Sequence, residues 1–132
     1  VTAVERSPVL AELLRDAAES LDLGSGMGSI TVHCGDSRLL LKEFPRADVV
    51  YLDPMFPGRG LHYAAPRKEL ELLRGLVGLD PDAKALADLA KTCAGRRMVI
   101  KRPHSARPLI GSPDFEVKGR AIRYDVYLSG PK

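Results

Sequence analysis

Residues 47–57 read Ala-Asp-Val-Val-Tyr-Leu-Asp-Pro-Met-Phe-Pro, and this stretch decides the fold. The run from Ala47 to Asp53 predicts a β-strand that is apolar on both faces, as expected for a central strand of a sheet. In a doubly wound sheet, ligands bind at the carboxyl ends of the strands. Asp53, the last residue of the predicted strand, is therefore the first candidate for a functional residue.

The sequence before this strand predicts two more strands, each followed by a helix. Val1 to Val4 is expected to be the end of a strand, and Ile30 to Cys34 a second strand. Ser7-Pro8 are typical of a helix N-cap and first helical position, and apolar residues recur at helical spacing to about Leu21. A short helix is expected around Ser37 to Phe44. This alternation of strands and helices is typical of an α/β fold with a mostly parallel sheet.

The sequence after the central strand predicts a loop, two helices and three strands. Residues 54–66 are rich in Pro, Gly, Arg, His and Tyr without periodicity, which indicates a functional loop. The first predicted helix covers about Lys68 to Gly75, and the second opens with Asp80-Pro81 as a cap pair and ends at Gly95. The predicted strands are Arg97 to Lys101, Phe115 to Lys118 and Ile122 to Leu128. The last two strands, joined near Gly119, should form an antiparallel hairpin at the C-terminus.

Composition narrows the class of protein. At 132 residues and 45% hydrophobic, the chain has the size of a single domain, residues 1–132. No apolar run approaches the roughly 20 residues of a membrane span, so we expect a soluble, cytoplasmic protein with no membrane partner. Cys34 and Cys93 are far apart and form no metal-binding motif, so no metal is expected. The net charge of +3 is compatible with a polyanionic partner but does not by itself indicate one.

The residues Asp53-Pro54-Met55-Phe56 supply the groups that could hold an amino group. The carboxylate of Asp53 and the carbonyl of Pro54 are hydrogen-bond acceptors, and Phe56 offers an aromatic face. An exocyclic amine of a nucleobase is a poor nucleophile because its lone pair is delocalised into the ring. Two acceptors that hold both N–H hydrogens can rotate the lone pair out of conjugation and direct it at a methyl donor.

This tetrapeptide resembles the [Asn/Asp]-Pro-Pro-[Phe/Tyr/Trp] motif of amino-methyltransferases, from which Met55 departs. Alone, it would also fit an ordinary turn after a strand. Its wider context resembles the RsmJ family, which methylates guanine N2 in small-subunit ribosomal RNA. The resemblance runs from about Glu5 to Leu128 and is carried by four segments in order: Val49 to Pro57, Leu76 to Gly78, Val99 to Pro103 and Arg123 to Tyr127.

The resemblance implies a Rossmann-like class I methyltransferase fold with S-adenosylmethionine as cofactor. Glu5 and Arg6 match the acidic loop whose carboxylate holds the ribose of the cofactor, and Glu5 also follows a strand end, where such an acid is expected. Gly35 and Asp36 match the adenine-contacting position, although Asp36 could equally be the N-cap of the next helix. Asp53, Pro54 and Phe56 would be catalytic, with Asp53 also touching the cofactor.

Basic residues near the motif suggest an RNA substrate, as naked RNA or a ribosomal particle. Cations and aromatic groups beside a reaction centre suit phosphate contacts and base stacking, although a solvated loop would look similar. A paired guanine amine is out of reach, so the target base would be unpaired or flipped out. The candidate substrate-binding residues are Arg59, Arg67 and Lys68 after the motif, and Lys101 and Arg102 after the following strand.

The segment Asp22-Leu-Gly-Ser-Gly-Met-Gly28 reads like a glycine-rich cofactor loop, but its flanks are reversed. A genuine loop follows a strand and opens a helix, whereas here a predicted helix precedes it and a strand follows. We therefore expect a helix-to-strand connection. By the same resemblance, the first strand of the family and its own glycine loop would lie upstream of Val1.

Three other functions compete with this interpretation. The same acceptor geometry would serve an adenine-N6 or cytosine-N4 methyltransferase. A non-catalytic RNA-binding domain of the same fold is a second alternative. A nicotinamide-dependent enzyme that used the segment 22–28 is disfavoured by the reversed flanks and by the lack of a plausible hydride-site acid or base.

Overall fold

The computed structural model describes residues 1–21, 28–44, 46–55 and 80–130. The chain forms two compact units, residues 1–43 and residues 44–132. The predicted single-domain organisation stays a prediction. Among the described residues, no helix is long and apolar enough to span a membrane.

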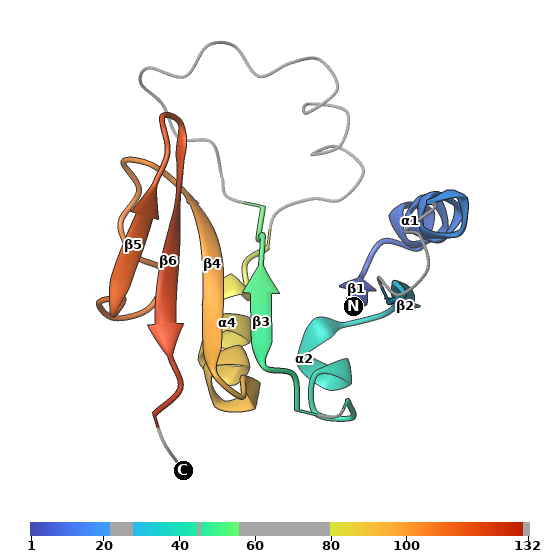
Figure 1. Cartoon of the computed structure of the whole chain (residues 1–132), viewed down its shortest axis with the longest axis horizontal. Coiled ribbons are helices and arrows are strands. Elements are labelled where there is room, and N and C mark those ends of the chain that lie inside the picture. Colours follow the sequence, from blue (N-terminus) through green and yellow to red (C-terminus); the bar gives the residue numbers. More distant parts are fainter. Residues whose placement is uncertain (22–27, 45, 56–79, 131–132) are drawn as a thin grey trace. The chain divides into compact units, whose positions relative to one another are not determined.

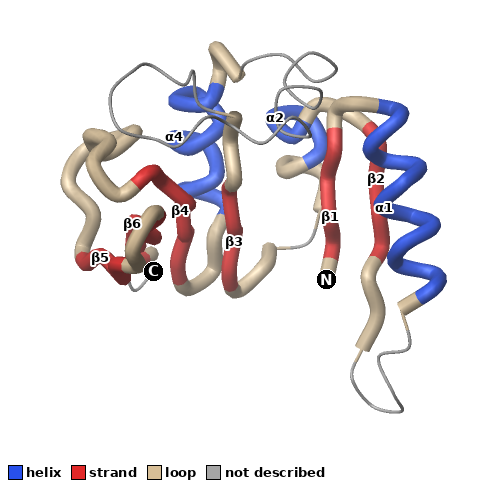
Figure 2. The backbone as a smooth tube through the Cα atoms, turned by 90° about the horizontal axis from the view of Figure 1, so that it is seen from above, coloured by secondary structure: helices blue, strands red, loops and turns tan. Residues whose placement is uncertain are grey.

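The first unit is built on two parallel strands. Strand β1 (Thr2–Glu5) pairs with β2 (Thr31–Cys34), so that Glu5 lies beside Cys34 at the carboxyl ends. Helix α1 (Pro8–Ser20) lies alongside β2 in Figure 2, and the fully buried Ala11 allows it to approach closely. Arg15 Nε donates a hydrogen bond of 3.3 Å to the carbonyl of Val32 and ties the helix to the strand.

The helices of this unit begin where their capping residues predict. Ser7 caps α1 by accepting a hydrogen bond from the amide of Leu10, and Pro8 occupies the first turn. Asp36 caps the short helix α2 (Ser37–Leu40) by accepting from the amide of Arg38 at 2.8 Å. Helix α2 ends at Leu40, before the predicted end at Phe44, and turns follow it.

The reversed flanks predicted for the glycine segment are confirmed. Helix α1 precedes it and strand β2 follows it, so it is a helix-to-strand connection. Its last residue, Gly28, has a φ of 81°, a left-handed conformation that glycine adopts without a Cβ penalty. Residues 22–27 lie outside the described part of the chain.

The second unit contains a four-stranded sheet in the order β3-β4-β6-β5 (Figure 1). Strand β3 (Val49–Leu52) runs parallel to β4 (Arg97–Pro103), and β4 runs antiparallel to β6 (Ile122–Leu128). Strand β5 (Phe115–Lys118) pairs antiparallel with β6 through a turn in which Gly119 donates to the carbonyl of Ile122 at 2.8 Å. The predicted C-terminal hairpin is confirmed.

Helix α4 (Ala83–Cys93) packs on one face of this sheet. Its small residues Ala83, Ala87 and Ala90 recur at helical spacing and are buried, so the helix backbone lies close to β3 and β4. The sheet side of the core consists of apolar residues on alternate strand positions: Val50, Leu52, Met98 and Ile100.

Two sequence predictions are wrong here. Strand β3 lies at the edge of the described four-stranded sheet, not at its centre, because only β4 pairs with it and its Val49 and Tyr51 face is exposed. The pair Asp80-Pro81 does not cap α4. Asp82 holds the N-cap position, and the carboxylate of Asp80 instead accepts a hydrogen bond from the amide of Met55.

The predicted loop after residue 55 and the helix Lys68 to Gly75 lie outside the described residues.

Candidate active site

Asp53 follows β3 directly and forms an ion pair with Lys101 of β4. Because Leu52 pairs with Ile100 in the parallel register, the next residue of each strand comes to lie side by side. The ammonium Nζ of Lys101 is 2.8 Å from Oδ2 of Asp53. The side chains are 35% and 49% exposed, respectively, so solvent and ligands can reach both.

The ion pair keeps Lys101 in its charged form. The hydrogen bond to Asp53 raises the pKa of Lys101, against a smaller opposing effect of burial, so the ammonium stays protonated at neutral pH. A carboxylate can accept several hydrogen bonds on its two oxygens. Asp53 can therefore be held by Lys101 and still accept an N–H hydrogen from a ligand.

Two tyrosines, which sequence reasoning missed, lie on the same face of the sheet. The rings of Tyr51 and Tyr124 are 6.4 Å apart at an interplanar angle of 48°. Partial burial and the negative charge of Asp53 raise the pKa of the Tyr51 hydroxyl. Tyr51 could have been found from the period of two along a strand, which puts it on the face of Asp53.

The backbone after Asp53 is anchored to the segment before α4. The amide of Met55 donates a hydrogen bond of 2.7 Å to Oδ2 of Asp80. Pro54, between the two anchored residues, is half-buried. Phe56 lies outside the described residues, as do the predicted substrate contacts Arg59, Arg67 and Lys68.

Lys101 and Arg102, both predicted to bind substrate, lie on opposite faces of β4. Arg102 is 7% exposed, and its guanidinium donates to the carbonyl of Arg107. A contact between Arg102 and a substrate stays a prediction, to which this burial gives no support. Lys101 is accessible, but its ammonium is already held by Asp53.

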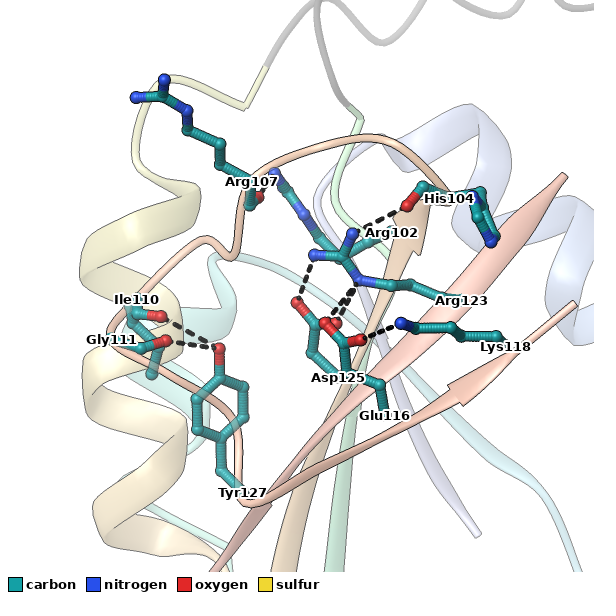
Figure 3. A network of polar contacts seen from close by, with 10 residues as sticks. All are labelled: Arg102, His104, Arg107, Ile110, Gly111, Glu116, Lys118, Arg123, Asp125 and Tyr127. Carbon is teal, nitrogen blue, oxygen red and sulfur yellow. Dashed lines mark hydrogen bonds and ion pairs between the residues drawn. The ribbon is translucent and has the colours of Figure 1, made fainter.

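A buried polar network holds the segment that follows β4 (Figure 3). Arg123 pairs with Asp125 at 2.6 Å and also donates to the carbonyl of His104 at 2.8 Å. The hydroxyl of Tyr127 donates to the carbonyls of Ile110 and Gly111 at 3.0 and 3.2 Å. Because Arg123 and Tyr127 of β6 are both buried, residues 104–111 are tied to the core rather than left as a free loop.

The predicted cofactor residues of the first unit lie together. The amide of Gly35 donates to the carbonyl of Glu5 at 2.9 Å, which joins the carboxyl ends of β1 and β2. Oε1 of Glu5 accepts a hydrogen bond of 2.7 Å from the amide of Ser7 and keeps the carboxylate near the strand end. Arg6, the next residue, is exposed.

The carboxylate of Asp36 is occupied by groups of the helix that it caps, α2. It caps α2 and also pairs through Oδ2 with the guanidinium of Arg38 at 2.6 Å. The hydrogen bonds from the Arg38 side chain and backbone lower the pKa of Asp36 from 3.8 to about 2. Among the described residues, no group of three or more potential ligands could hold a metal ion.

The chain matches one protein family over almost its whole length. A sequence model of the family described as "Putative SAM-dependent methyltransferase" matches residues 1–129.

Curated relatives carry a more specific name. The chain is 42% identical to the "Ribosomal RNA small subunit methyltransferase J" of Thioalkalivibrio sulfidiphilus and 41% identical to that of Coxiella burnetii. These matches cover 98% and 99% of the chain but 54% and 53% of the relatives, so the chain spans about half their length. The crystal structure of a SAM-dependent methyltransferase from Neisseria gonorrhoeae is similar with a TM-score of 0.65 and 29% identity, covering 98% of this chain and 52% of that one. The predicted α/β methyltransferase fold is therefore confirmed.

Proposed function

Because this chain belongs to the family of SAM-dependent methyltransferases that matches residues 1–129, we propose that it methylates the exocyclic N2 of a guanine in small-subunit ribosomal RNA. The methyl donor would be S-adenosylmethionine. The names of the curated relatives support the RNA substrate, and the amine-binding groups around Asp53 support the reaction. A ribosomal substrate would be met in the cytoplasm, where we propose that the protein acts.

The observation that carries this proposal is the half-exposed carboxylate of Asp53 at the carboxyl end of β3, held by Lys101. A guanine amine that gives one N–H to Asp53 and the other to the Pro54 carbonyl would have its lone pair turned out of the ring plane. Little general-base strength is needed, because the amine becomes more acidic as its nitrogen is alkylated. Lys101 would keep the Asp53 carboxylate oriented during this step.

The residues of the first unit fit the cofactor that the family uses. S-adenosylmethionine supplies an electrophilic methyl group on a sulfonium. Glu5 offers a carboxylate at the end of β1, and one of its oxygens is already fixed by the amide of Ser7, which suits hydrogen bonds from ribose hydroxyls. Gly35 and Asp36 would contact the adenine, with the carboxylate of Asp36 largely occupied by Arg38.

The substrate side of the proposal rests on the sequence. Phe56 would stack on the flipped guanine, and Arg59, Arg67 and Lys68 would contact RNA phosphates. We propose that Lys101 acts on the substrate indirectly, by holding the Asp53 carboxylate, and not by binding an RNA phosphate. Its ammonium is 2.8 Å from that carboxylate.

Methyl transfer to ribosomal RNA tests the proposal. The complete protein would be given labelled S-adenosylmethionine with naked small-subunit RNA or with small-subunit particles, and the product nucleosides would be identified by mass spectrometry. N2-methylguanosine is expected. If N6-methyladenosine or N4-methylcytidine is found instead, the protein is an adenine-N6 or cytosine-N4 methyltransferase. Absence of any transfer would favour a non-catalytic RNA-binding domain.

A further inference from the structure

The amide of Met55 is used in a way that a proline at that position could not reproduce. It donates a hydrogen bond of 2.7 Å to Oδ2 of Asp80, and proline has no N–H to donate. We propose that Asp80 is a positioning residue that orients the carbonyl of Pro54 toward the substrate amine. This inference rests on the proposed function, because it assigns the Pro54 carbonyl as an amine acceptor.

Peptide geometry connects Asp80 to that carbonyl. The C=O of Pro54 and the N–H of Met55 belong to one peptide group, which is planar and trans, so the two bonds point in opposite directions. When Asp80 fixes the direction of the Met55 N–H, it also fixes the direction of the Pro54 C=O. The Asp80 carboxylate therefore acts on the Pro54 carbonyl from the opposite edge of the same peptide group.

Asp80 is itself held in place. Its backbone carbonyl accepts a hydrogen bond of 3.1 Å from the amide of Ala83, the first residue of α4. Ala83 is buried against the sheet, so the anchor of the carboxylate moves with the core of the unit. A hydrogen bond to a carboxylate is also stronger than one between neutral groups.

The segment 53–55 is thus held at both ends. Lys101 holds the side chain of Asp53 at 2.8 Å, and Asp80 holds the backbone at Met55 at 2.7 Å. Pro54 lies between them with its φ fixed by its ring. Both proposed amine acceptors, the Asp53 carboxylate and the Pro54 carbonyl, are then set by residues that lie outside the tetrapeptide.

The test compares Asp80 variants of the complete protein. Asp80→Ala should lower kcat by about 10- to 100-fold while the KM values for RNA and S-adenosylmethionine stay within about twofold, because an acceptor is misdirected but binding groups remain. Asp80→Asn keeps an acceptor oxygen of the same shape and should recover most of kcat. Asp88→Ala, on the exposed side of α4, is the matched control and should leave kcat unchanged.

A double-mutant cycle separates positioning from general damage to the fold. In a Met55→Pro background the N–H is gone, so Asp80→Ala should cost no further activity. A loss as large as in the wild-type background would overturn the proposal. So would an unchanged kcat for Asp80→Ala in an enzyme that is otherwise active.

Amide hydrogen exchange measures the hydrogen bond without any catalysis. The Met55 amide should exchange at least about tenfold faster in Asp80→Ala than in the wild type or in Asp88→Ala. Unchanged exchange would overturn the inference whatever the enzyme does. If exchange accelerates but the wild type transfers no methyl group to any RNA, the proposed function fails, and the catalytic role of Asp80 fails with it, while the hydrogen bond stands.

Discussion

The ammonium of Lys101 lies 2.8 Å from the carboxylate of Asp53, across the parallel pairing of β4 with β3. The two residues are 48 positions apart in the sequence, yet their side chains form an ion pair at the carboxyl ends of β3 and β4. Because both side chains are at least one-third exposed, solvent screens the pair and its contribution to stability is small. We expect the ion pair to act mainly by orienting the Asp53 carboxylate.

Replacing Lys101 by Met should therefore affect activity more than stability. We expect kcat of the complete protein to fall by about tenfold or more. The free energy of unfolding should change by less than about 1 kcal/mol, because the pair is screened. Steady-state methyl transfer and urea unfolding measure the two effects. Lys84→Met, on the exposed side of α4, serves as the control. A large loss of stability without loss of kcat would contradict the assignment.

Replacing Asp53 by Ala should abolish methyl transfer. The side chain is half exposed, so its removal leaves no cavity, and the circular dichroism spectrum and melting temperature should stay close to the wild type. The measurement is incorporation of labelled methyl into small-subunit RNA, with Asp88→Ala as the control. Normal turnover by Asp53→Ala would refute the role of this carboxylate.

The carboxyl group of Asp36 should titrate at an unusually low pH. Its pKa in the fold is about 2, against 3.8 ordinarily, chiefly because of the hydrogen bond from the Arg38 side chain. A lowered folded pKa favours the fold above pH 3.8, and this contribution disappears as the pH falls from 3.8 to about 2. Carbon-13 NMR of the side-chain carboxyl should show the low midpoint. Arg38→Ala should move it upward, and a wild-type midpoint near 3.8 would rule out the pairing.

Replacing Gly95 by Ala should destabilise the second unit. A Cβ at this position would lie 3.0 Å from the carbonyl oxygen of Ala47 and 3.3 Å from Cα of Asp48, and both are backbone atoms that cannot move aside easily. The Gly95 amide also donates to that Ala47 carbonyl at 2.7 Å. We expect a loss of about 1–3 kcal/mol in urea unfolding. Gly111→Ala is the control because a Cβ there meets nothing within 4 Å, and equal stability of both variants would be the contrary result.

Replacing Tyr127 by Phe should loosen the segment after β4. The variant loses the hydroxyl that donates to the carbonyls of Ile110 and Gly111, in a side chain that is 1% exposed. We expect about 1 kcal/mol less stability and faster amide exchange over residues 104–112. Tyr124→Phe, from the other face of β6, should leave that exchange as it is. Protection that survives in Tyr127→Phe would show that the hydroxyl does not hold the segment.

Local sequence signals predicted most of the elements. Ser7-Pro8 marked the start of α1, and the alternation of apolar runs and turns marked the six described strands. Asp53 was found because a single carboxylate followed an apolar strand. These features depend on residues that are neighbours in the sequence, which is why the sequence contains them.

Features that depend on strand register were not predictable. The pairing of Lys101 with Asp53 requires the alignment of β4 on β3, which no local pattern specifies. The edge position of β3 depends on which strands pair with it. Asp80 has the residue type of a helix cap, and only the tertiary fold brings the Met55 amide to its carboxylate instead.

Arg102 is buried, whereas the neighbouring Lys101 is accessible. The site therefore depends on which position of β4 each of the two cations occupies. Neighbouring strand residues face opposite sides, so deleting one residue between Gly95 and Lys101 would slip β4 by one position. The ammonium would then enter the core, and the guanidinium would take its place beside Asp53. Deletion of a single residue from this segment is therefore expected to do more harm than a substitution within it, because it would move the Lys101 ammonium to the buried position of Ile100 and put an arginine in its place, and the two cations are not interchangeable.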